Sequence, residues 1–159
     1  DIIIKSKDEG KNMRAFEIAK GYEEENVILP TRATEKSAGY DLRALEGYTL
    51  KPGETHFFKT GLKAKMEKDD VLLLFPRSSL AIKKGLRLTN SVAVIDADYY
   101  GNKDNDGHIM ISLFNFSDHE VTIESQERIA QGIFMKYLTV EGDDASGERK
   151  GGFGSTKTK

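Results

Sequence analysis

The segment 90–101 combines an apolar stretch with side chains that can do acid–base chemistry. A strand here would deliver two carboxylates, Asp96 and Asp98, to a turn, where a carboxylate can act as a general base. The two acids begin like a calcium-binding loop, but Tyr100 and Gly107 stand where that loop needs an oxygen ligand and a glutamate. A calcium loop is therefore excluded. A hairpin whose acids are simply solvated also explains this segment when it is taken alone.

A second segment has the chemistry of a phosphate site. An apolar strand pattern ends at Pro76 and is followed by Arg77, Ser78 and Ser79 at a probable helix start. Backbone N–H groups at a helix start, serine hydroxyls and a guanidinium all suit phosphate oxygens. An ordinary helix cap beside a surface arginine explains the same residues, so this segment alone leaves both interpretations open.

The residues 141–159 are polar and glycine-rich, and Phe153 stands among glycines. The stretch is not a Walker A loop, because Thr156 and not glycine precedes Lys157. It is not a dinucleotide fingerprint either, because Lys157 occupies the last glycine position. We predict a flexible arm in which the phenylalanine closes over a flat ring while the glycines let the backbone approach phosphates. Plain disorder is the alternative that composition allows.

The elements that must position these residues are mostly short strands. Apolar residues alternate or cluster between turn signals, which is typical of a sandwich, barrel or jelly roll. The expected strands are Ile2–Lys5, Thr55–Thr60, Leu62–Met66, Val71–Phe75, Val92–Ile95, Ile109–Phe114, Val121–Ile123 and Gly132–Leu138. Two short helices are expected, at Met13–Lys20 before Gly21 and at Ser78–Lys84 before Gly85. The sequence therefore predicts one all-β domain over residues 1–140 and an arm over 141–159.

The composition restricts the class of protein. With 159 residues, 38% hydrophobic and 31% charged, the chain fits one compact domain better than a disordered or membrane protein. A net charge of −2 offers no basic surface for nucleic acid. The absence of cysteine excludes disulfides and thiolate metal sites, and the three histidines lack metal-ligand spacing. The first residues lack the basic start and apolar stretch of a signal peptide, so we expect a cytoplasmic protein.

Five segments, in this order, resemble the five motifs of the trimeric dUTPase family: Ala38–Leu42, Pro76–Leu80, Val94–Tyr99, Glu127–Gln131, and Arg149 with Gly151–Thr156. The resemblance runs from about Pro30 to the end of the chain. It implies a β jelly-roll homotrimer whose three active sites are shared, with the arm of one subunit closing over a site made by others. The implied reaction is Mg²⁺-dependent hydrolysis of dUTP to dUMP and pyrophosphate, which limits uracil incorporation into DNA and supplies dUMP for dTTP synthesis.

The resemblance also implies roles for individual residues. Asp96 resembles the general base that deprotonates the water attacking the α-phosphorus, and aspartates are ordinarily ionised at neutral pH. Asn90, with Val94 of the same hairpin, resembles the uracil reader. Tyr99 resembles the residue that packs against deoxyribose and leaves no room for a 2′-hydroxyl. Phe153 resembles the lid that stacks on uracil.

The phosphate contacts are implied in the same way. The resemblance assigns α- and β-phosphate contacts to Ser78, the Ser79 backbone and Gln131, and arm contacts to Gly154, Ser155 and Thr156. It places the cations Arg77, Arg128 and Arg149 around the site, with Arg149 on the γ-phosphate. Arg128 is equally explained as a structural ion pair. Asp41 either binds a water of the metal shell or holds Arg77, and magnesium itself is expected on the triphosphate.

Two parts of the chain depart from the common pattern, and three rival functions remain. The turn Lys103–Gly107 lengthens the third motif, and the residues up to about Asn26 include the expected helical insertion.

The related dCTP deaminases need a glutamate where Ser112 stands, which disfavours deamination. A dUTPase-like binding or regulatory protein would not need the intact base and arm. A general nucleotide pyrophosphatase would leave the hairpin Asn90–Tyr99 without a purpose.

Overall fold

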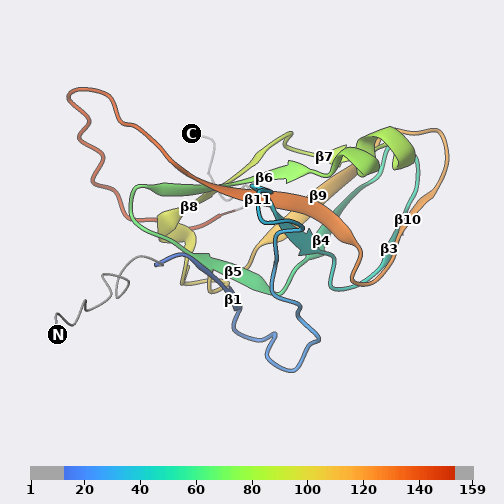
Figure 1. Cartoon of the computed structure of the whole chain (residues 1–159), viewed down its shortest axis with the longest axis horizontal. Helices are drawn as coiled ribbons and strands as arrows, with labels where there is room; N and C mark the ends of the chain where they lie inside the picture. Colours follow the sequence, from blue (N-terminus) through green and yellow to red (C-terminus); the bar gives the residue numbers. More distant parts are fainter. Residues whose placement is uncertain (1–12, 153–159) are drawn as a thin grey trace, which may run out of the picture.

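The computed structural model describes residues 13–152 and shows a β protein with two short helical turns (Figure 1). The elements in chain order are β1 (Ala15–Ile18), β2 (Tyr40–Arg43), β3 (Tyr48–Leu50), β4 (Thr55–Lys59), β5 (Leu62–Lys65), β6 (Asp70–Pro76), η1 (Leu80–Lys84), β7 (Leu86–Leu88), β8 (Ala93–Asp96), η2 (Ala97–Tyr99), β9 (Met110–Asn115), β10 (Val121–Ile123) and β11 (Arg128–Lys136).

The strands form antiparallel sheets around one apolar core. The larger sheet has the order β2-β11-β6-β8, a second has the order β4-β9-β7, and the pairs β1-β5 and β3-β10 lie beside them. Leu72 and Leu74 of β6 and Leu113 of β9 are fully buried, and they alternate with more exposed neighbours as the two-residue period requires. Figure 1 shows β11 crossing the middle of the molecule, with β4 and β9 behind it. The expected all-β, jelly-roll-like fold is confirmed.

Most of the expected strands are present, with small shifts at their ends. β11 begins at Arg128 instead of Gly132, because Ile129 and Ala130 are fully buried and belong to the ladder. The strands β2, β3 and β7 were not predicted from the sequence. The strand expected at Ile2–Lys5 lies outside the described residues.

The prediction of a helix at Met13–Lys20 is wrong. The segment forms β1, which pairs antiparallel with β5 so that Phe16 lies opposite Ala64. The Phe16 ring packs 5.5 Å from Tyr40 and 5.4 Å from Phe134, measured between ring centroids. Pairing with an available strand edge, together with this aromatic cluster, outweighs the local helix preference.

The second helical prediction is confirmed, although the helix is a wider π-helical turn over most of its length. Residues 78–84 are helical, with a π-helical turn at Leu80–Lys84. Gly85 ends it in a left-handed conformation, with φ of 67°, and its N–H donates to the Leu80 carbonyl. A glycine is suited to this position because a side chain would be strained there.

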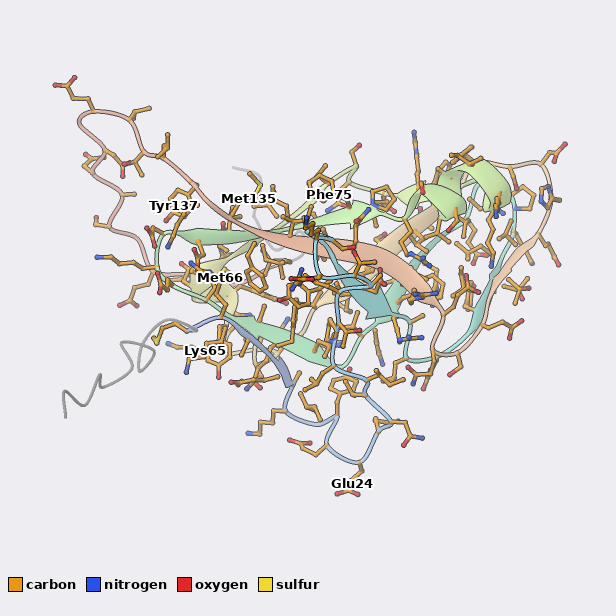
Figure 2. All side chains as sticks on the ribbon, viewed as in Figure 1. Glu24, Lys65, Met66, Phe75, Met135 and Tyr137 are labelled. Atoms are coloured by element: carbon orange, nitrogen blue, oxygen red, sulfur yellow. The ribbon has the colours of Figure 1, made fainter. Side chains whose placement is uncertain are left out.

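After β11 the chain leaves the core. Leu138 and Val140 are 95% and 78% exposed, and the residues from 137 to 152 carry no helix or strand. This segment loops away from the end of β11, where Met135 and Tyr137 lie, and returns beside η2 (Figures 1 and 2). The division into a domain over 1–140 and an arm over 141–159 stays a prediction. In the described part of the chain, no helix is long and apolar enough to cross a membrane.

A charged cluster fixes the first residue of β6. The Asp70 side chain is 1% exposed and accepts hydrogen bonds from Arg14 Nε at 2.7 Å and from the Glu67 N–H at 3.0 Å. Lys136 Nζ lies 2.9 Å from its other oxygen. Burial alone would raise the pKa of this carboxyl, but the hydrogen bonds from Arg14, Lys136 and the Glu67 N–H outweigh burial and lower its pKa to about 2.

Asp70→Asn should make the protein less stable at neutral pH, because it removes the charge that pairs with Arg14 and Lys136. The loss should be only roughly 1–2 kcal/mol, because solvent screens these two partly exposed cations. A carboxyl whose pKa is lower in the folded state contributes its stability above the unfolded pKa, near 4. That contribution is lost as the pH falls toward about 2. Urea unfolding of both proteins from pH 7 to pH 2.5 checks this: the difference should shrink below pH 4. A difference that is constant with pH would contradict it.

Candidate active site

The structure gathers the predicted nucleoside-binding residues and the predicted base in one pocket of about 220 Å³. The pocket is lined by Asn90, Ala93, Val94, Ile95, Asp96, Tyr99, Arg149 and Gly152. Five of these residues were singled out from the sequence. We call this pocket the nucleoside half-site.

Strand β8 aims the catalytic candidate outward. Ala93 and Ile95 are buried, whereas Val94 and Asp96 alternate with them and face solvent. The strand ends at Asp96, where the 3₁₀ turn η2 begins. At the other end, Ser91 adopts a φ of 65°, a left-handed conformation that non-glycine residues seldom adopt outside functional or tight turns. The hairpin thus presents the Asn90 amide and the Asp96 carboxylate on the same surface.

The predicted base, Asp96, is held by a residue of the arm. Arg149 forms an ion pair with Asp96 through one nitrogen, and its Nε donates to Asp98 at 2.6 Å. The hydrogen bond to Asp98, with the charges of both carboxylates, raises the pKa of Arg149, so the guanidinium stays charged. The resemblance had placed this arginine on the γ-phosphate. In the structure it lies on the carboxylates of its own chain.

Tyr99 forms the floor of the nucleoside half-site. Its side chain is 4% exposed, and burial raises the pKa of its phenol, which therefore stays neutral. The arm lies directly against the ring: a Cβ built on Gly152 would come within 2.7 Å of Tyr99 Cε2. A glycine is required for this approach.

A second pocket, of about 450 Å³, holds the predicted phosphate contacts, and we call it the phosphate half-site. It is lined by Ala33, Ser37, Ala38, Gly39, Asp41, Arg77, Ser78, Ser79, Arg128, Gln131 and Ile133. Strand pairing brings these residues together, since Gln131 of β11 lies opposite Asp41 of β2 on one side and opposite Phe75 of β6 on the other. A Cβ on Gly39 would lie 2.6 Å from Gln131 Oε1, so the loop before β2 packs closely on that amide.

Asp41 lies between the two arginines of the phosphate half-site. Its oxygens are 3.7 Å from Arg77 Nε and 3.5 Å from Arg128 Nη1. Two guanidiniums lie beside this carboxylate, an arrangement that fits the holding of Arg77. Among residues 13–152, the one cluster of three possible metal ligands is Glu67, Asp69 and Asp70, and Lys136 forms an ion pair with each of them.

Asp96 of the nucleoside half-site and Arg77 of the phosphate half-site lie at opposite ends of β6. Asp96 pairs with Val71 near the start of the strand, and Arg77 follows its last residue. At roughly 3.3 Å per residue, the chain from Val71 to Arg77 spans about 20 Å. Within the described chain no residue lines both pockets. The structure therefore brings the predicted residues together as two groups.

Some predicted residues fall elsewhere, and some contacts were missed. Phe153, Gly154, Ser155 and Thr156 lie outside the described residues. A larger pocket of about 680 Å³ at Phe16, Tyr40 and Phe134 contains none of the predicted catalytic or substrate-binding residues.

No role for Asn105 or His108 is evident from the sequence, yet both contact the Tyr99 hydroxyl, Asn105 through its side-chain amide and His108 through its carbonyl oxygen. The lengthened turn was the signal that pointed to this region.

Comparison with known proteins agrees with this geometry. Residues 25–157 match the family model for dUTPase. The chain is 49% identical over 146 residues to the deoxyuridine 5′-triphosphate nucleotidohydrolase of Lactococcus lactis, covering 91% of this chain and 97% of that protein.

Solved structures of dUTPases are also similar to this chain. The dUTPase from Streptococcus mutans superimposes with a TM-score of 0.75 at 46% identity, over 80% of this chain and 99% of that one. A mutant dUTPase from phage phi11 of S. aureus, which coordinates a structural Mg(II) ion, shares the fold with a TM-score of 0.69 at 20% identity, over 86% and 98%. On the family match and the identity to these relatives, the chain belongs to the dUTPase family.

Proposed function

We propose that this member of the dUTPase family hydrolyses dUTP to dUMP and pyrophosphate in a homotrimer. Each active site would take its nucleoside half-site from one copy, its phosphate half-site from another, and an arm that closes over both. The proposal rests on the family match and on the placement of the predicted residues in the two pockets.

The distance along β6 is the observation that carries the proposal. A general base must lie within hydrogen-bond reach of the attacking water, which in turn lies beside the α-phosphorus. Asp96 and the phosphate contacts at Ser78 are separated by about 20 Å of strand in one chain. A second copy that brings its Ser78 to this Asp96 removes the separation, and cyclic symmetry repeats the same contact in every copy.

The nucleoside half-site accounts for recognition of the base and the sugar. The Asn90 amide offers both a donor and an acceptor, as the edge of uracil requires. Cytosine presents the opposite pattern and would leave buried polar groups unpaired, which discriminates strongly. Val94 forms an apolar side of this pocket. Tyr99, held in the floor, would contact deoxyribose where a 2′-hydroxyl would have to fit.

The chemistry follows from the charges. Asp96 takes a proton from water as the water oxygen forms a bond to the α-phosphorus. The bond to the bridging oxygen of the β-phosphate breaks, and pyrophosphate leaves. Arg77, Ser78 and Gln131 stabilise the charge on the phosphate oxygens, a form of electrostatic stabilisation that is worth several kcal/mol in enzymes. Bound magnesium would neutralise part of the triphosphate charge and hold its shape.

The arm has two parts in this proposal. Arg149 would leave Asp96 and Asp98 for the γ-phosphate when substrate binds, since a guanidinium pairs well with phosphate oxygens. The departure frees Asp96 to act as the base. Phe153 would then stack on uracil, with Gly154, Ser155 and Thr156 near the phosphates.

The substrate is tested by supplying the protein and Mg²⁺ with dUTP, dCTP, dTTP and UTP separately. Ion-exchange chromatography follows nucleotide identity and pyrophosphate release. We expect dUMP and pyrophosphate from dUTP, with turnover of the other three at least roughly 100-fold slower. Conversion of dCTP to a uracil nucleotide would indicate a deaminase, equal turnover of all four a general pyrophosphatase, and no turnover a binding protein.

Asp96→Asn should keep nucleotide binding and lose about 10²- to 10⁴-fold in kcat, because the water loses its proton acceptor. Steady-state kinetics and binding of a non-hydrolysable dUTP analogue measure the two effects. Asp118→Asn, which removes an exposed carboxylate in the turn after β9, is the matched control and should act like the parent. Near-normal turnover by Asp96→Asn would place the base elsewhere.

A further inference from the structure

The Tyr99 hydroxyl is held on both sides by the turn that follows it. It donates to the His108 carbonyl at 2.6 Å and accepts from Asn105 Nδ2 at 2.8 Å. A phenol hydroxyl has one proton to donate, and here that proton is used inside the protein. The ring therefore reaches the nucleoside half-site with its outer end fixed.

Asn105 connects this hydroxyl to the rest of the turn. Its Oδ1 accepts from Asn102 Nδ2 and from the Gly107 N–H, both at 3.0 Å. Its Nδ2 is the group that contacts Tyr99. Every polar atom of this one half-buried side chain is thus used, and an amide satisfied in this way holds a single orientation.

The turn itself is braced from outside by the N-terminal segment and β5. Asp106 accepts from the Lys20 N–H at 2.9 Å and pairs with Lys63 Nζ at 2.7 Å. His108 stacks on Tyr22, with ring centroids 4.4 Å apart.

The imidazole adds a second point of attachment. Burial lowers the pKa of His108 to about 4, so the neutral ring accepts the Gly61 N–H at 3.0 Å. In Figure 1 the turn lies between η2 and the β1–β5 pair. The lengthened turn and the N-terminal segment therefore form one rigid support behind Tyr99.

We infer that Asn105 is a positioning residue for sugar selectivity, acting by holding the Tyr99 ring against the 2′ position of the nucleotide. The inference rests on the proposed function, in which Tyr99 contacts deoxyribose. A ring fixed at its hydroxyl cannot tilt away to admit a ribose 2′-hydroxyl. A ring released at that end can tilt in this way, whereas binding of a deoxynucleotide, which lacks the 2′-hydroxyl, would change little.

Asn105→Asp tests the inference with the least disturbance. The carboxylate keeps an acceptor for Asn102 and for the Gly107 N–H but loses the donor to Tyr99. We expect the ratio of kcat/KM for dUTP to that for UTP to fall roughly 3- to 10-fold, about the effect of one net hydrogen bond. The fall should come mainly from a lower KM for UTP, with kcat for dUTP within about twofold of the parent. Lys103→Ala, an exposed change in the same turn, is the matched control.

Tyr99→Phe provides a second variant that leaves the turn intact and keeps the test decisive if Asn105→Asp lowers Tm severely. It should lose selectivity by a similar factor, and the double variant should be no worse than either single one, because both remove the same contact. A selectivity ratio within twofold of the parent in both single variants, or additive losses in the double variant, would overturn the inference.

Tyr99→Ala separates the two possible failures. If the parent does not discriminate dUTP from UTP, or if Tyr99→Ala still does, the proposed sugar contact is wrong and the inference falls with it. If the parent discriminates and Tyr99→Ala does not, unchanged selectivity in Asn105→Asp overturns the inference alone.

Discussion

Antiparallel pairing of β6 with β8 on one side and β11 on the other is the constraint on which the site depends. The ladder fixes Asp96 at one end of β6 and Gln131 near the other, and the rise of a strand sets the distance between them. The cluster around Asp70 secures the end that carries Asp96. A rigid strand therefore keeps Asp96 and Arg77 apart within one chain, and this separation is the basis for proposing a site shared between copies.

The position of Asp96 at the end of β8 also places it within reach of Arg149 in the arm. Arg149 pairs with both Asp96 and Asp98 in the structure, and its positive charge offsets part of the repulsion between these two exposed carboxylates. A substrate that attracts this arginine would uncover the base at the moment when it is needed. Tyr99 contacts both the arm and the turn Lys103–Gly107. Gly152 of the arm packs on its ring, and Asn105 of the turn holds its hydroxyl.

Sequence patterns predicted the elements that are long or strongly patterned, and the residues that chemistry requires at a phosphate or a base. The strand at Val71–Phe75 and the helical turn closed by Gly85 are examples, and the grouping of Asn90 with Asp96 follows from a single hairpin. The β1 strand was missed because its pairing with β5 is a tertiary contact. The hydrogen bonds of Asn105 could not be predicted for the same reason, since they depend on how the turn Lys103–Gly107 folds back on Tyr99.

The most direct test of a site shared between copies is complementation between two inactive chains. One chain carries Asp96→Asn, and the other carries Ser78→Asp, which sets a negative charge against the phosphates. Each is assayed alone with dUTP and Mg²⁺, and the two are then unfolded, mixed in equal amounts and refolded together. Shared sites predict that the mixture regains activity, with about a quarter of its sites carrying both intact halves. A mixture no more active than the separate chains would show that each copy completes its own site and would contradict the account.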